Sequence, residues 1–61
     1  VPQAECIQIA TAISKSGIAN GIAINSNSHD DGKVTTENAS TQCTGDNSGS
    51  GSNKLAFTVN G

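Results

Sequence analysis

Apolar residues recur with a helical spacing near the start of the chain and with a strand-like spacing near its end. The first apolar residues recur at i, i+3, i+4 and i+7, which is the spacing of one helix face. These residues are Cys6, Ile9, Ala10 and Ile13. Pro2 and Glu5 are typical of a first helical turn, and Lys15 followed by Gly17 is typical of a helix end. The pattern therefore predicts a helix that begins close to Val1, with Cys6 facing the core.

A short strand is predicted at residues 22–25, where the branched side chains of Ile22 and Ile24 occupy alternate positions. Asn20-Gly21 precedes it and is compatible with a tight hairpin turn. A hairpin needs a strand before the turn, whereas the preceding residues are helical. We therefore interpret Asn20-Gly21 as the loop that leads from the helix into the strand.

The clearest strand pattern lies near the end of the chain. There Leu55, Phe57 and Val59 alternate with small or polar residues, and the pattern ends at Asn60-Gly61. Such a strand has one apolar face, which requires neighbours both within a sheet and on the core side. The pattern offers only one other strand to pair with it.

A second, shorter helix is predicted between the two strands. Thr35 or Thr36 is suited to cap its first turn, and Glu37 lies in that turn. Ala39 and Cys43 are one turn apart, so both are expected to face the same side. The segments around this helix are polar: residues 25–33 are interpreted as a surface loop, and residues 44–52 as a flexible Gly/Ser linker within one domain spanning residues 1–61.

The two cysteines enclose most of the chain, because residues 7–42 lie between Cys6 and Cys43. Metal-binding and redox pairs usually place their cysteines two to four residues apart. A disulfide is therefore the favoured interpretation, and two separate buried thiols are the alternative. Disulfides persist outside the cytosol, so an extracytoplasmic location is expected.

Composition indicates a shortage of core material. Of the 61 residues, 33% are apolar, with a single aromatic residue and no Trp, Tyr or Met. Small chains bury a low fraction of their surface even with an ordinary apolar content. We therefore expect a segment of a larger domain, or a chain that needs a second chain to complete its core.

Charge and hydropathy exclude several classes of function. With three lysines, no arginine and a net charge of −2, the chain lacks the basic surface that binds nucleic acids. No apolar run approaches the length of a membrane span, and no signal peptide is recognised at the start. Any export signal is expected to lie outside this sequence.

No segment predicts an active site, a cofactor site or a metal site. Residues 27–32 approach a calcium-loop pattern, with Asp31 and Gly32 in register, but the final acidic ligand is replaced by Asn38. His29 and Asp30 have no nucleophile tied to them. Residues 38–40 match the N-glycosylation sequon, which occurs often by chance. The chain is therefore not expected to be an enzyme.

Four features stand out in chain order: Ala-Glu-Cys opening an Ile/Ala-rich helix, Gly-Ile-Ala-Ile-Asn, a weak helix ending in Cys43, and Asn-Lys-Leu-Ala-Phe-Thr-Val. This order of elements resembles the C-terminal part of a type IVb pilin, and among that family it is most similar to plasmid thin-pilus and enterobacterial pilins. The family assembles through a long hydrophobic N-terminal helix, which this sequence lacks.

The resemblance implies an α+β fold with short helices packed on an antiparallel sheet, incomplete on its own. It implies that the Cys6–Cys43 bridge bounds a variable outer region and that residues 25–33 are exposed. The residues expected to form the sheet core are Ile22, Ile24, Leu55, Phe57 and Val59. Partners would be other pilin subunits or the N-terminal portion of the same domain, with a host or recipient cell surface as a further possibility.

The sequence thus favours a structural subunit of an extracellular pilus filament at the bacterial cell surface, serving attachment, aggregation or conjugative contact. The alternative is a small secreted module, closed by one disulfide, that docks to a protein as an inhibitor or bacteriocin-like peptide does. Ile7 and Ile18 have no evident internal place and are candidates for filament contacts.

Overall fold

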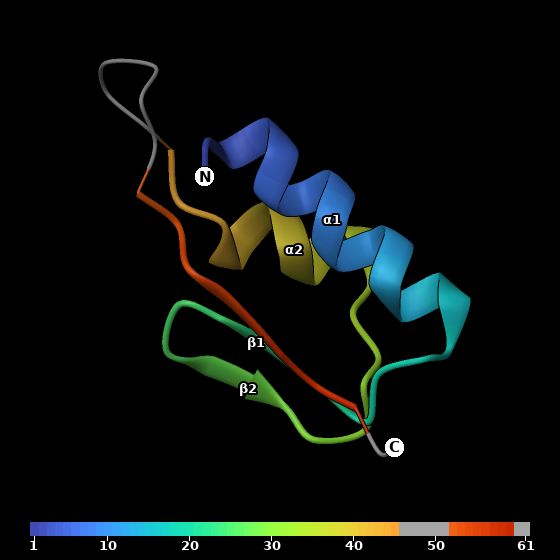
Figure 1. Cartoon of the computed structure of the whole chain (residues 1–61). Coiled ribbons are helices and arrows are strands. Elements are labelled where there is room, and N and C mark those ends of the chain that lie inside the picture. Colours follow the sequence, from blue (N-terminus) through green and yellow to red (C-terminus); the bar gives the residue numbers. More distant parts are fainter. Residues whose placement is uncertain (46–51, 60–61) are drawn as a thin grey trace.

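Two helices pack on a three-stranded antiparallel sheet (Figure 1). The computed structural model describes residues 1–45 and 52–59. The elements in chain order are α1 (Gln3–Ser16), β1 (Gly21–Ile24), β2 (Asn27–His29), α2 (Thr36–Gln42) and β3 (Leu55–Thr58). The strand order in the sheet is β2-β1-β3, so the middle strand is β1. The expected α+β class, with short helices on an antiparallel sheet, is confirmed.

The first helix follows its sequence signals at both ends. Pro2 is the extended N-cap residue, and Gly17 adopts the left-handed conformation with φ 72° while its N–H donates to the Ser14 carbonyl. Cys6 and Ala10 are fully buried, as their shared stripe predicts. Ile9 was expected in the same stripe but is 37% exposed. The buried face of α1 is therefore narrower than the apolar stripe that the sequence predicts.

A β-hairpin replaces part of the predicted polar loop at residues 25–33. Ile24 pairs with Asn27, so Asn25 and Ser26 form a two-residue turn in which Asn25 has φ 56°. Asparagine tolerates this left-handed conformation better than most residues. The prediction missed β2 because all three of its residues are polar, as suits a short edge strand with little core contact. The first strand accordingly ends at Ile24 and not at Asn25.

The last strand pairs antiparallel with the other edge of β1, with Leu55 opposite Ile24 and Phe57 opposite Ile22. Ile22 and Ile24 are buried as expected, and Leu55 is half-buried against the core. The expectation that Phe57 and Val59 are sheet core is wrong for the part of the chain described here.

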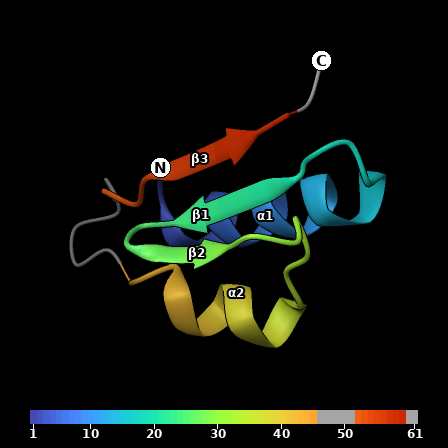
Figure 2. The same ribbon diagram turned by 90° about the horizontal axis from the view of Figure 1, so that it is seen from below.

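Phe57 is 38% exposed and Val59 is 57% exposed. The physical reason is their position at the edge of the sheet. Figure 2 shows α1 behind β1 and α2 on the β2 side, so neither of these two helices lies directly over β3. The strand ends at Thr58, and residues 60–61 lie outside the described residues.

The second helix is capped as its sequence predicts. Thr35 is the N-cap residue, and its Oγ1 accepts a hydrogen bond from the Asn38 N–H at 3.1 Å. The helix ends at Gln42, and the N–H of the following residue, Cys43, donates to the Ala39 carbonyl. Most of the predicted linker, residues 46–51, lies outside the described residues.

The core is small and lies where α1 meets α2 and β1. It contains two large aliphatic residues and several small ones. Its buried members are Cys6, Ala10, Ala19, Ile22, Ile24, Val34, Ala39 and Cys43. Alanines let α1 and α2 approach closely, which leaves room for the two cysteines to meet. Neither helix in the described ranges is long and apolar enough to cross a membrane.

Candidate functional site

The two cysteines meet at the centre of the helix layer. The Sγ atoms of Cys6 and Cys43 are bonded at 2.03 Å, and the two residues are 0% and 1% exposed. The bond joins the first half of α1 to the end of α2. Because both sulfurs are consumed, neither cysteine offers a thiolate for catalysis or metal binding.

The side chain of Asn53 makes hydrogen bonds to three separate parts of the chain, one of which is Thr44, the residue after Cys43. Its Oδ1 accepts hydrogen bonds from the Thr44 N–H at 2.8 Å, the Thr44 hydroxyl at 3.0 Å and the Asn25 amide at 3.0 Å. Its Nδ2 donates to the carbonyls of Val1 at 3.1 Å and Thr44 at 3.0 Å. Only 5% of Asn53 is exposed, so these bonds satisfy an amide that would otherwise be buried without partners.

The side chain of Asn25 extends the same network into the hairpin. Its Nδ2 also donates to the Gln42 carbonyl at 2.9 Å, at the end of α2. Its Oδ1 accepts from the Lys54 N–H at 3.0 Å, while its own N–H donates to the Lys54 carbonyl at 2.8 Å. We call Asn25 and Asn53 the amide pair. It links the N-terminus, the hairpin turn, the end of α2 and the start of β3.

Sequence analysis did not single out the amide pair, because its two residues lie in polar stretches without periodicity. The available signals were indirect. Asn25 directly follows a strand and precedes Ser26, which is a turn context, and Asn53 directly precedes the clearest strand. Neither signal indicates a contact between positions so far apart in the chain.

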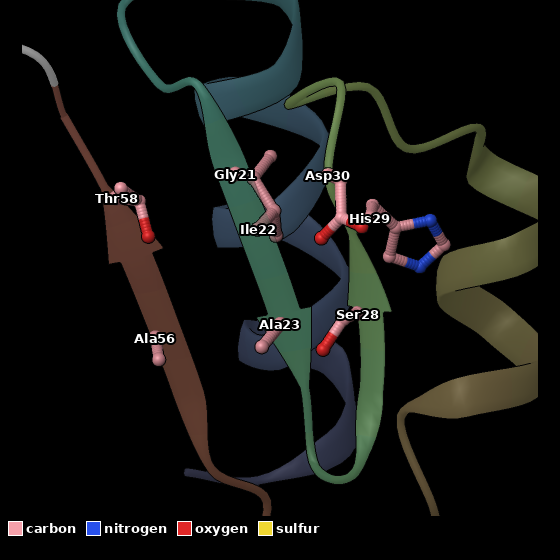
Figure 3. Close-up of a pocket in the computed structure, with 8 residues that line it drawn as sticks. All are labelled: Gly21, Ile22, Ala23, Ser28, His29, Asp30, Ala56 and Thr58. Atoms are coloured by element: carbon pink, nitrogen blue, oxygen red, sulfur yellow. The ribbon is translucent and has the colours of Figure 1, made fainter.

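The residues that resembled a catalytic or calcium site do not form one. The ring of His29 is turned toward α2 and away from Asp30 (Figure 3), with 2.6 Å between its Nε2 and the Gln42 Oε1. Asp31 accepts a hydrogen bond from the Lys33 N–H, and the following Gly32 has φ 69°, so this stretch is a tight turn. Within residues 1–45 and 52–59, no group of three or more His, Cys, Asp or Glu residues is placed to hold a metal ion.

One shallow depression of about 80 Å³ lies over the sheet (Figure 3). Small side chains dominate its lining, which consists of Gly21, Ile22, Ala23, Ser28, His29, Asp30, Ala56 and Thr58. Sites for small molecules usually measure about 300–1,000 Å³ and converge several polar groups. The depression is therefore too small for such a ligand. What the described residues provide is a cross-linked scaffold that presents surfaces.

The comparisons with known proteins agree with such a scaffold. The family model described as PilS N terminal matches residues 1–60. The crystal structure of a type IV b pilin from Salmonella typhi matches with a TM-score of 0.94 and 52% sequence identity, and the match covers 100% of this chain and 41% of that chain. A comparison with curated proteins gives no significant match. Members of this family are structural subunits and not enzymes. Its sequence and fold together show that the chain belongs to the type IV pilin family represented by the PilS N-terminal model.

Proposed function

We propose that this chain is a segment of the subunit of an extracellular type IV pilus at the bacterial cell surface. The observation that carries the proposal is the match to a type IVb pilin over the whole chain, at 52% identity and a TM-score of 0.94. The lack of a catalytic or metal constellation in the described residues is compatible with a role in packing and surface display.

Within such a subunit, we propose that residues 1–61 form the C-terminal segment of a single globular domain. The segment spans 41% of the solved pilin that it matches, so more than half of that chain has no counterpart here. Its partners would be the remaining part of the same domain and other pilin subunits. The filament would serve attachment to cells, aggregation or contact between conjugating bacteria.

Filament contacts would come from apolar residues without an internal place. Ile18 fits this description, because it is 58% exposed in the loop after α1. Ile7 fits it less well than the sequence suggested, since it is partly buried against the core cluster. We therefore retain Ile18 as the candidate contact residue.

Labelling of intact bacteria tests the proposal. Antibodies raised against the folded, oxidised 61-residue chain are expected to decorate filaments along their length in immunogold electron micrographs of cells that express the complete protein. Deletion of the gene should remove the filaments and reduce attachment or conjugative transfer, and complementation should restore both.

The alternative function gives a different result in the same experiment. A secreted inhibitor or bacteriocin-like module would appear as soluble antigen in the medium, with no label on filaments. That outcome would contradict the proposal. If an Ile18→Glu substitution left the number of filaments unchanged, only the assignment of Ile18 as a filament contact would be contradicted, and the proposed pilus function would stand.

A further inference from the structure

The sheet has a second face, which lies opposite the helix layer. Ile22 and Ile24 are buried in the core, so Ala23 between them belongs to the opposite face. Residues paired with Ala23, and those two positions further along each outer chain segment, share that face. We call this set the outer sheet face, and its members are Ala23, Ser28, Asp30, Lys54, Ala56 and Thr58. Figure 3 views it with α1 behind the sheet.

The composition of the outer sheet face suits contact with water and not burial in a core. None of its members has a large apolar side chain, and two of them, Asp30 and Lys54, are charged and exposed. The small side chains of Ala23 and Ala56 line the shallow depression described above. Antiparallel sheets commonly keep one face in water in this way. This face is therefore available to a partner.

The two charges of the outer sheet face lie at opposite corners. Asp30 follows β2 and is level with the start of β1, whereas Lys54 precedes β3 and is hydrogen-bonded to Asn25, past the end of β1. Ala23 lies in the central strand, near the midpoint between the two charges. Neither charge forms an ion pair with another residue in the ranges that the structure describes. A face with opposite charges at opposite corners is complementary to itself.

We propose that the outer sheet face binds the same face of a second copy of this chain. With a two-fold axis through Ala23, Asp30 of each copy lies over Lys54 of the other. The small residues around the axis allow the two sheets to approach closely. The strands of the two sheets then cross at a steep angle, as they do in orthogonally packed sheets.

This contact joins two filaments and does not add a subunit to one filament, so the inference rests on the proposed function. A two-fold contact uses the same surface on both copies and is complete with two of them. A filament, in contrast, grows through contacts between two different surfaces of each subunit. The paired copies therefore belong to different filaments, and the outer sheet face promotes their side-by-side association.

A single contact of this kind is weak. Three strands about 4.8 Å apart and about four residues long give a face on the order of 200 Å². Stable interfaces bury about 800 Å² on each partner. Separate subunits are therefore expected to stay monomeric, whereas filaments that present many copies associate through the sum of their contacts. Because salt screens exposed charges, the association should weaken as the salt concentration rises.

Charge reversal in purified filaments tests the pairing of Asp30 with Lys54. Electron micrographs at low salt give the fraction of filaments that lie side by side. Asp30→Lys and Lys54→Asp are each expected to lower this fraction at least about 5-fold, and the double reversal should restore it to within about 2-fold of the unaltered protein. The two single reversals change the net charge in opposite directions, so a general charge effect would not lower the fraction in both.

Glu37→Lys is the matched control. It makes the same charge change as Asp30→Lys at an exposed position in the first turn of α2, outside the outer sheet face, and should have little effect. A double reversal that fails to restore the association, or a control that lowers it as strongly as Asp30→Lys does, would overturn the inference.

Cross-linking tests the position of the two-fold axis. Unlabelled and isotopically heavy filaments that carry Ala23→Cys are mixed and treated with a short bis-maleimide. Cross-linked pairs of one light and one heavy copy are expected, at a yield at least about 10-fold above that of Ser26→Cys in the exposed hairpin turn. Equal yields at the two positions, or pairs without any mixed light and heavy members, would overturn the inference.

The complete protein coupled densely to beads separates this inference from the proposed function. Clumping of the beads that is lost in both single reversals and restored in the double reversal would support the self-association surface, even if the labelling of bacteria showed no filaments. Clumping that does not respond to the reversals, or that is absent from the unaltered protein, would overturn the inference.

Discussion

At the scale of single residues, the side-chain amides of Asn25 and Asn53 hold together segments that a larger apolar core would otherwise hold. Asn53 is buried and makes hydrogen bonds to three separate segments of the chain. A buried amide is favourable only when its donors and acceptors are satisfied, and every buried side-chain polar atom in the described residues has a partner. The amide pair therefore fixes the relative positions of the N-terminus, the hairpin turn and β3 where few apolar side chains are available.

Replacing Asn53 with alanine tests this role. The substitution leaves the Thr44 N–H and the Thr44 carbonyl without their partner, while the Val1 carbonyl keeps the backbone N–H of residue 53. We expect a loss of about 2–4 kcal/mol in the free energy of unfolding, measured by urea denaturation of the oxidised protein. Asn27→Ala is the control, because its exposed side chain makes a single 3.3 Å bond to the Ile24 carbonyl. It should cost less than about 1 kcal/mol. Similar losses of stability in both variants would show that the hydrogen bonds of Asn53 contribute no more than a single exposed bond does.

Two glycines with the same backbone conformation give a second prediction at this scale. Gly17 and Gly32 have φ values of +72° and +69°, but an added Cβ would meet nothing within 4 Å at Gly17 and would lie 2.1 Å from the Ala19 carbonyl oxygen at Gly32. Gly17→Ala should cost only the left-handed penalty, about 1 kcal/mol. Gly32→Ala adds a clash with backbone and should cost at least about 3 kcal/mol.

Thermal denaturation of the two variants, followed by circular dichroism, checks this difference. The Gly17 variant is the internal control for conformational strain, because both positions are left-handed. If the two variants melted at the same temperature, the close approach of Gly32 to Ala19 would not be an important constraint in solution.

At the scale of elements, the helices were predictable and half of the hairpin was not. The helix α1 has an apolar period, a proline at its start and a glycine directly after its end, and each of these signals can be recognised in the local sequence. The strand β2 has no apolar residue at all, and its pairing depends on Asn25 accepting a positive φ. Sequence periodicity reports burial, so it cannot reveal a strand that buries almost nothing.

The contacts of the candidate site could also be predicted only in part from sequence patterns. The Cys6–Cys43 pairing is plausible from the cysteine count and spacing, because only one intramolecular pairing exists. The partners of Asn53 depend on which loops the fold brings together, and no local pattern encodes them. The exposure of Phe57 and Val59 was missed because alternation identifies a strand face but does not say whether another element lies over it.

The capping of α2 is a prediction that belongs to this scale. Thr35→Ala removes the side-chain acceptor for the Asn38 N–H and should lower the free energy of unfolding by about 1 kcal/mol. Thr36→Ala is the matched control, since Thr36 is the first residue of the helix and is exposed. It should have an effect within about 0.5 kcal/mol. Urea denaturation of both variants measures the difference, and an equal loss would mean that Thr35 does not cap the helix in solution.

At the scale of the whole molecule, the described residues combine a small core with one covalent cross-link. Among the residues that the structure describes, Ile22 and Ile24 are the two large aliphatic side chains that are fully buried. The bond between Cys6 and Cys43 closes a loop with a sequence separation of 37, which includes β1, β2 and α2. Closing such a loop reduces the entropy of the unfolded chain, so the cross-link offsets part of the shortage of apolar contacts.

Removal of this bond should therefore weaken the entire fold and not only the helix layer. The double substitution Cys6→Ala with Cys43→Ala is expected to cost about 4 kcal/mol in the free energy of unfolding, with α1, α2 and the sheet melting together at a lower temperature. Reduction of the unsubstituted protein separates the cross-link from the packing of the sulfurs, because both side chains then remain in place. Both samples should lose similar stability, as measured by circular dichroism and by the exchange of β1 amides.

Since both cysteines are almost fully buried, reduction should require transient unfolding and should accelerate strongly in urea. Free thiols that react at once in the native, unreduced protein would show that the bond is absent and that the core is held together in some other way.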